Sequence, residues 1–331
     1  MAQRNILAKK QFSIKSFFFQ WEWLLVIVFI LINVMNANIS DYYLNPTLLL
    51  DATMTFLDKA LLVLPMVFIL VLGDIDISVA STIALSSVVM AVLYNLGVPM
   101  PVAILFCLLV GTLCGYINGI LLTKFKELSA VIVTLSTMII FRGIAYIILE
   151  DQAAGKFPKW FNFLSWGYMG KIPFILIVFV ILAIIFGLLL HKTTFGRRIF
   201  AMGNNIEACR FSGVQVDKIK VIVFTLTGLM AGVTAIFLTS RMGSTRPNVA
   251  MGYELDIIAM AVLGGVSTAG GKGRMIGAIL AIFIIGFLRY GLGLINIPAQ
   301  ALLIILGLLL IVSVMIPNLK GRFQTLRKVK S

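Results

Sequence analysis

Long apolar segments, each able to cross a lipid bilayer as a helix, constrain this sequence more than any other feature. A helix needs about 20 residues to cross the hydrocarbon core of a membrane. Two further apolar segments, 60–73 and 254–266, are shorter than that. We therefore predict an all-α polytopic membrane protein with about ten transmembrane helices, two of them short or broken. The long segments are 23–39, 77–96, 99–123, 128–149, 172–191, 220–240, 275–291 and 298–317.

The composition excludes a water-soluble enzyme. Of the 331 residues, 60% are apolar and only 12% are charged, whereas soluble domains have about 45–50% apolar and 25% charged residues. The net charge of +14 comes from residues that lie between the apolar segments. We therefore expect membrane lipid, and no nucleic acid, around this chain.

The positions of the cationic residues predict its orientation. With the N-terminus inside and ten crossings, nineteen Lys and Arg residues lie on the inner side and six on the outer side. Because cationic loops stay in the cytoplasm, both termini are predicted to be cytoplasmic. The first apolar segment has no small-residue cleavage site after it and is predicted to be a retained anchor. The chain then divides into a cytoplasmic N-terminal segment (1–22), a transmembrane domain (23–317) with a basic cytoplasmic loop (192–219), and a basic cytoplasmic tail (318–331).

The two short segments share a pattern of acids and glycines. Paired interruptions in the two halves of a transporter indicate broken helices beside a central pathway. The acids are Asp74 and Asp76 in one segment and Glu254 and Asp256 in the other, and the glycine breaks are Gly73 and Gly264–Gly265.

Asp74 and Asp76 admit two interpretations. An acid among apolar residues in a membrane usually faces a cavity or pairs with a cation. Alternatively, the two acids lie in a short cytoplasmic turn and cap the helix that follows. Their spacing is also found in Mg²⁺ sites, but no further oxygen ligands accompany them here.

Glycines recur every four residues at Gly111, Gly115 and Gly119, and again at Gly228 and Gly232. This spacing makes a flat strip on one helical face, which lets another helix approach closely. We therefore assign these glycines to packing, with Asn118 as a candidate for the pathway.

The basic loop contains a predicted short helix near residues 204–213. Asn204 or Asn205 can cap its start, Glu207 suits its positive first turn, and Gly213 can end it in a left-handed conformation. The helix either lies against the protein's own surface or docks a cytoplasmic partner.

The sequence holds no recognisable catalytic or metal site. The nearest match to a phosphate-binding loop, VSTAGGKG at 266–273, lacks its first glycine and the final Ser or Thr. HExxH and GxSxG are absent as well. We therefore predict a transport subunit that is not itself an enzyme and binds no cofactor.

Five stretches, in order, give the chain its resemblance to the permease subunits of bacterial ABC sugar importers, in the ribose and autoinducer-2 branch. It departs from the usual pattern at Asp74, Ala80 and Ser136, where glycine is common. The stretches are GDIDISVAS (73–81), GYINGILLTKF (115–125), VTLSTMIIFRGIAYI (133–147), TTFGRRIFAMGNNIEACRFSGVQV (193–216) and MGYELDIIAMAVLGGVSTAGGKGRMIGA (251–278).

The resemblance implies a multi-pass protein of the bacterial cell membrane that imports a small sugar such as ribose, rhamnose or an autoinducer-2-like compound. It implies three partners: a second permease subunit, a cytoplasmic ABC ATPase that hydrolyses ATP, and an extracytoplasmic sugar-binding protein. The residues that it suggests for ATPase coupling are Asn205, Glu207, Ala208, Arg210 and Gly213. The pathway candidates are Asp74, Asp76, Ser78, Asn118, Thr134, Arg142, Glu254, Asp256, Gly264 and Gly265.

Two other functions stay open on the sequence. A secondary transporter driven by an ion gradient would use Asp74, Asp76 and Arg142 as an ion relay. A membrane enzyme acting on lipid-linked sugars would use the two aspartates.

Overall fold

The computed structural model describes residues 21–298 together with 301, 304, 307 and 308. Its first half contains α2 (Trp21–Ile39), α3 (Pro46–Leu72), α4 (Val79–Asn95), α5 (Met100–Lys124) and α6 (Ala130–Leu149). A segment of short elements follows, with β1 (Ala154–Gly155), η1 (Lys159–Asn162), α7 (Phe163–Trp166), β2 (Tyr168–Met169) and β3 (Ile172–Pro173).

The second half contains α8 (Phe174–Lys192), α9 (Thr194–Asn204), α10 (Ile206–Phe211), α11 (Val216–Met242), β4 (Ser244–Thr245), α12 (Tyr253–Leu263) and α13 (Met275–Leu294). Within the described residues, seven helices are long and apolar enough to cross a membrane. The shorter α4 is also apolar. The chain is therefore an all-α polytopic membrane protein, as predicted; segment 298–317 lies largely outside the described residues, and segments 1–20 and 318–331 lie wholly outside them.

Helix α3 forms the centre of the bundle. It contacts α8, α9, α11, α12 and α13, and 94% of its most apolar window is buried. Asn45 caps its start by accepting a hydrogen bond from the Thr47 amide at 3.0 Å, and Gly73 ends it in a left-handed conformation with φ 87°. A helix surrounded on all sides must be apolar all round, and the sequence of α3 is apolar apart from a few charged positions.

The prediction of a short segment at 60–73 is wrong, because α3 begins at Pro46 and has 27 residues. Asp58 and Lys59 interrupt the apolar run and made the helix look shorter than it is. Both side chains are buried, with Asp58 0% and Lys59 5% exposed. Lys59 therefore does not lie in an outer loop as the charge distribution assumed.

The second short segment is confirmed, since α12 has 11 residues. At about 1.5 Å per residue it covers roughly half of the hydrocarbon core. The non-helical stretch 246–252 precedes it, and Val249 and Ala250 of this stretch are buried. The main interruption of the helix thus lies before α12, whereas Gly264–Gly265 ends it.

Glycines bring α5 and α11 into backbone contact. A Cβ atom on Gly115 would lie 2.3 Å from the Phe224 carbonyl oxygen, and one on Gly111 would lie 2.5 Å from the Gly228 oxygen. In the other direction, a Cβ on Gly228 would lie 2.2 Å from the Gly111 oxygen. The predicted packing role of both glycine strips is confirmed, and the two strips pack against each other.

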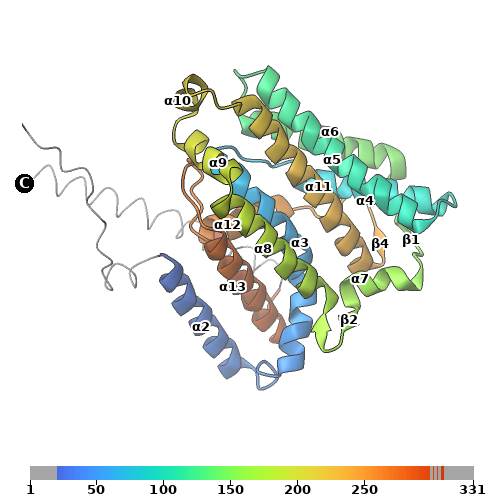
Figure 1. Cartoon of the computed structure of the whole chain (residues 1–331). Helices are drawn as coiled ribbons and strands as arrows, with labels where there is room; N and C mark the ends of the chain where they lie inside the picture. Colours follow the sequence, from blue (N-terminus) through green and yellow to red (C-terminus); the bar gives the residue numbers. More distant parts are fainter. Residues whose placement is uncertain (1–20, 299–300, 302–303, 305–306, 309–331) are drawn as a thin grey trace, which may run out of the picture.

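The connections between helices alternate between two ends of the bundle. One end, called the basic end here, holds residues 73–78, 125–129, 193–215 and 264–274; there the Gly271 amide donates to the Val71 carbonyl at 2.8 Å. The opposite end holds 150–173 and 243–245, where β1 pairs antiparallel with β4. Figure 1 shows α9 and α10 at one end, and β1, β4 and α7 at the other.

We predict that Gly115→Ala destabilises the bundle, because the added methyl group has no space against α11. Overpacking of this kind costs about 1–3 kcal/mol. Gly143→Ala is the matched control, since a Cβ at Gly143 in α6 meets nothing within 4 Å. Thermal unfolding of both variants in detergent can be followed by alkylation of the buried thiols Cys107 and Cys114. Equal unfolding temperatures for the two variants would contradict the close packing of α5 against α11.

Candidate coupling surface and translocation residues

Local capping signals build the helix α10 at the basic end. Asn205 caps it by accepting a hydrogen bond from the Ala208 amide at 3.0 Å. Glu207 lies in its first turn, where a negative charge is favourable. Gly213 follows its end with φ 79°. The predicted short helix therefore exists, with Asn205 rather than Asn204 as its cap; Asn204 ends the preceding helix α9 instead.

The exposed face of α10 contains an aromatic side chain that the sequence analysis missed. Phe211, the last residue of the helix, is 91% exposed. Glu207 and Ala208 are also exposed, whereas Cys209 is buried. An exposed aromatic ring among polar groups is typical of an anchor residue in a protein interface. The sequence signal was the single aromatic residue at the end of the short loop helix.

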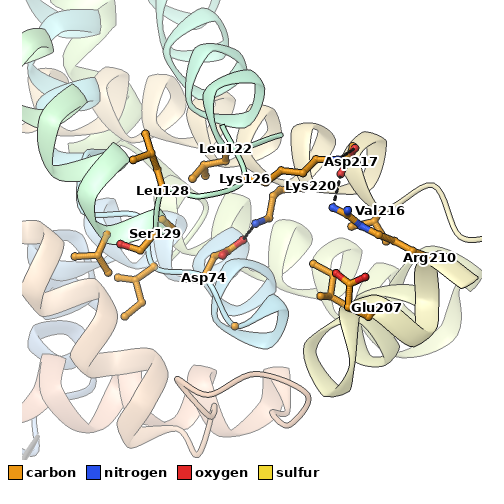
Figure 2. Close-up of a pocket in the computed structure, with 15 residues that line it drawn as sticks. Asp74, Leu122, Lys126, Leu128, Ser129, Glu207, Arg210, Val216, Asp217 and Lys220 are labelled. Atoms are coloured by element: carbon orange, nitrogen blue, oxygen red, sulfur yellow. Dashed lines mark hydrogen bonds and ion pairs between the residues drawn. The ribbon is translucent and has the colours of Figure 1, made fainter. Parts of the chain in front are cut away.

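A pocket of about 410 Å³ opens beside α10. It lies between α10, the start of α11, the turn after α3 and the connection between α5 and α6 (Figure 2). Three ion pairs cross its walls. Lys220 contacts Asp74 at 2.8 Å, Lys126 contacts Asp217 at 3.0 Å, and Arg210 contacts Asp217 at 3.1 Å.

The turn between α3 and α4 carries Asp74 and gathers four further pathway candidates. Asp76 is buried and accepts hydrogen bonds from the Ser78 amide at 2.9 Å and from the Ser78 hydroxyl at 2.7 Å. Asn118 donates to the Ser78 oxygen at 2.8 Å. Thr134 donates to the Ala130 carbonyl at 2.8 Å and accepts from the Ile77 amide at 3.2 Å. Burial raises the pKa of Asp76 to about 6, although the hydrogen bonds from Ser78 act in the opposite direction.

The two aspartates differ from each other. Asp74 pairs with the cation Lys220, as the first interpretation expected. Asp76 lies in the short turn before α4 and accepts hydrogen bonds from Ser78, the residue at the N-cap position, but it makes no bond to the first turn of the helix. Within the described residues, no three His, Cys, Asp or Glu side chains gather as a metal site would need.

Arg142 lies elsewhere and holds the non-helical stretch 246–252. Its Nη1 atom donates to the carbonyls of Pro247 at 2.6 Å and Val249 at 2.8 Å. It lies twelve residues into α6, which is about 18 Å along the helix and two turns beyond Thr134. Because Arg142 is remote from Asp74 and Asp76 and occupied by these carbonyls, the three residues do not form the relay that an ion-driven transporter was predicted to use.

Charged side chains that are buried or half-buried join α3 to α11, α12 and α13. Asp256, which is half-buried, contacts two cations, with Lys59 at 3.0 Å and Arg289 at 2.7 Å. The fully buried acid Asp58 contacts Arg241 at 2.9 Å. A charge that is removed from water must be paired to be tolerated at this depth.

Of these five residues the sequence analysis singled out only Asp256. The remaining four are charged residues within or beside apolar runs, and that placement is the signal that could have identified them as paired charges. A cavity of about 330 Å³ opens near this cluster, lined by residues that include Arg241, Arg246 and Asn248.

Glu254 lies at the start of α12 beside this cluster. Its Oε1 atom accepts from the Gly252 amide at 3.3 Å, and its buried Oε2 atom has no hydrogen-bond partner. The charge of Glu254 is opposite to that of nearby Arg142. These two residues and Asp256 therefore form a second group of pathway candidates, separate from the group at the turn.

Gly264 and Gly265 serve close packing at the end of α12. A Cβ on Gly264 would lie 2.5 Å from the Ala278 Cα atom of α13. Gly265 has φ 85°, and its Cβ would lie 2.6 Å from the Trp21 ring. The Trp21 Nε1 atom donates to the Leu263 carbonyl at 2.9 Å, which anchors the start of α2 here.

Comparisons with known proteins agree with this architecture. Residues 48–314 match the family described as "Branched-chain amino acid transport system / permease component". The ribose import permease protein RbsC of Bacillus subtilis (strain 168) is 35% identical over 90% of this chain and 91% of its own length. The autoinducer 2 import system permease protein LsrD of Escherichia coli (strain K12) is 35% identical over 89% of this chain and 91% of its own length. No solved structure matches the chain.

We predict that Asp256→Ala strongly destabilises the protein, because it leaves the buried Lys59 and the half-buried Arg289 without their shared acid. Breaking a buried ion pair costs about 3–5 kcal/mol. Asp217→Ala is the matched control: Asp217 also contacts two cations, but its side chain is 48% exposed against 12% for Asp256. An exposed pair contributes about 0–1 kcal/mol.

The measurement is the unfolding temperature of each purified variant in the same detergent. A similar, small shift for both variants would show that the cluster does not hold α3, α12 and α13 together.

Proposed function

We propose a transport function on the premise that this chain belongs to the branched-chain amino acid transport system / permease component family, which it matches over residues 48–314. The chain is the membrane-spanning permease subunit of an ABC importer. Its substrate is a small sugar, such as ribose, rhamnose or an autoinducer-2-like compound. The similarity to ribose and autoinducer 2 import permeases over about nine-tenths of the chain carries this proposal.

The subunit works with partners that supply energy and substrate. An extracytoplasmic binding protein delivers the sugar, a second permease subunit completes the pathway, and a cytoplasmic ABC ATPase hydrolyses ATP. This chain binds no cofactor of its own. The family membership supports this division of labour, and the protein lies in the bacterial cell membrane.

The ATPase docks on α10. The helix is short, capped at both ends and exposed at the basic end of the bundle, and it presents Phe211 and Glu207 outward. Asn205 and Gly213 fix its ends, while Arg210 ties it to α11 through Asp217. A helix of six residues is not stable alone, so its position depends on these ties and on a partner.

The basic end faces the cytoplasm. On this topology the chain has ten spans with 298–317 as the last, and the N-terminal segment 1–22 and the tail 318–331 are both cytoplasmic. The loop 192–219 is then the coupling loop of the transmembrane domain 23–317. The gathering of the connections 125–129 and 193–215 at one end of the bundle supports this topology.

A continuous series of contacts joins α10 to the interior. Arg210 and Asp217 link α10 to α11, and Lys220 of α11 pairs with Asp74 in the turn before α4. In the same turn the Ser78 hydroxyl donates to Asp76 and accepts from the Asn118 amide. Movement of α10 by the ATPase therefore acts on the residues proposed for the pathway, with Thr134 as a further neighbour. The group of Arg142, Glu254 and Asp256 forms the deeper part of the pathway, and Gly264 and Gly265 allow the helices beside it to approach.

We predict that Glu207→Lys and Phe211→Ala each abolish ATP-dependent sugar uptake by vesicles that contain the full importer. Loss of an aromatic anchor costs about 2 kcal/mol or more of binding energy, so co-purification of the ATPase with the permease should fall as well. The matched control is Glu127→Lys, the same charge change at an exposed acid on the same end but outside α10.

Uptake equal to wild type in the α10 variants would refute the docking assignment. Uptake by the purified chain alone, driven by an ion gradient without ATP, would instead establish the secondary transporter. The two outcomes can be told apart because the first is measured with the full importer and ATP, and the second with the purified chain alone and an ion gradient.

We predict that a cysteine placed at Lys159 reacts with a membrane-impermeant thiol reagent added to intact cells, whereas one at Arg197 does not. Lys159 lies in η1 at the opposite end from α9, which contains Arg197. The three native cysteines are buried and should contribute little background. Reversed labelling would overturn the orientation.

A further inference from the structure

A groove runs between α8 and α13. The two helices contact each other and lie side by side in Figure 1. The volume of the groove is about 670 Å³. Phe179, Ala183 and Gly187 of α8 and Ile279 and Phe283 of α13 line it. Because both helices are long and apolar enough to span a membrane, the groove opens where lipid acyl chains lie.

Gly187 helps to make the groove. It leaves space on the side of α8 that faces the groove, because a Cβ there would meet only the Met275 Cγ atom, at 3.8 Å. Neighbouring side chains on the same surface, such as Leu188 and Ile276, are 53% and 65% exposed. A larger residue at position 187 would therefore fit sterically and fill the space.

Polar groups line only one end of this groove. His191, Lys192 and Arg274 are found there, where α8 ends and α13 begins. His191 and Lys192 are exposed. Arg274 is 58% exposed at its side chain while it contacts Glu22 at 2.9 Å. Two cations thus lie at the membrane surface directly beside an apolar cleft.

The hydrogen bond of His191 sets the chemistry of its other nitrogen. The Nε2 atom accepts from the Met275 amide at 3.1 Å, so the neutral ring carries its proton on Nδ1 and presents a donor there. The N-terminus of α13, a helix of 20 residues, adds its partial positive charge at the same place. The rim therefore combines a donor, the cation of Lys192, the Arg274 guanidinium that also contacts Glu22, and a helix dipole, which together suit a phosphate group.

We propose that this groove binds an anionic phospholipid, with its acyl chains between α8 and α13 and its phosphate at His191, Lys192 and Arg274. Basic pockets between transmembrane helices bind anionic headgroups in this manner. A zwitterionic lipid fits less well, because its own cation would face Lys192 and Arg274. The inference requires only that the chain spans a membrane, so it is independent of the imported substrate and of the ATPase.

The test measures which lipid the purified full-length chain retains. The protein is reconstituted in vesicles of phosphatidylcholine and phosphatidylglycerol at a ratio of three to one, re-extracted in detergent, and its bound lipid is quantified by mass spectrometry. We expect an excess of phosphatidylglycerol over the vesicle ratio. Lys192→Gln should reduce this excess about fivefold, the effect of one cation near a membrane surface.

Two matched pairs of variants distinguish lipid binding in the groove from general attraction of anionic lipid to a basic surface. Lys218→Gln removes an exposed lysine at the same end, outside the groove, and should leave the excess unchanged. Gly187→Leu fills the groove without changing charge and should remove the excess. Gly143→Leu, at a glycine of α6 with open space around it, should not.

Three results would overturn the proposal. Equal loss in Lys192→Gln and Lys218→Gln would indicate attraction to the surface charge alone. Unchanged retention in Gly187→Leu would show that the groove holds no acyl chain. Wild-type protein without any excess of phosphatidylglycerol would mean that another occupant, such as the apolar segment 298–317 or a second copy of the chain, fills the groove.

Discussion

Every charge that enters this bundle must find its partner inside the protein, and the position of α3 depends on that constraint. Water is absent from the hydrocarbon core, so an unpaired buried charge there costs several kcal/mol. Asp58 and Lys59 lie near the middle of α3, and their partners Arg241 and Asp256 come from α11 and α12. Two helices are therefore placed against α3 by charge as well as by apolar packing, and α13 joins them because Arg289 also contacts Asp256.

The features that the sequence predicted well have local causes. The cap at Asn205, the left-handed Gly213 and the glycine strips of α5 and α11 are each encoded within a few residues. Segment 60–73 was misjudged because its correct length depends on Lys59 pairing with a residue 197 positions away. No periodicity within the segment carries that information. For the same reason, the sequence indicated Arg142 as a pathway residue but could not show that it binds the carbonyls of Pro247 and Val249.

The α5–α11 interface and the attachment of α10 are held by different kinds of contact, so they differ in how firmly they are fixed. The α5–α11 interface brings backbone against backbone at Gly115 and Gly228, and such packing cannot slide without opening a void. These two helices therefore move as one body. Helix α10 is tied to this body by Arg210 and Asp217, a half-exposed pair that gains little energy. A displacement of α10 consequently reaches the interior through α11 and Lys220, rather than through α10 itself.

The half-length helix α12 differs from the other spanning elements in what holds it. A complete helix satisfies its own backbone, whereas the stretch 246–252 must borrow donors from elsewhere. Arg142 supplies them from α6, while Asp256 fixes the first turn of α12 to α3 and α13. Glu254 stands between these attachments with one buried oxygen unpartnered. Charged contacts exchange readily for water when a cavity opens, but glycine packing does not. A helix held by charged contacts can therefore change its contacts while the α5–α11 body keeps its shape. This makes α12 the part of the bundle best suited to line a pathway that opens and closes.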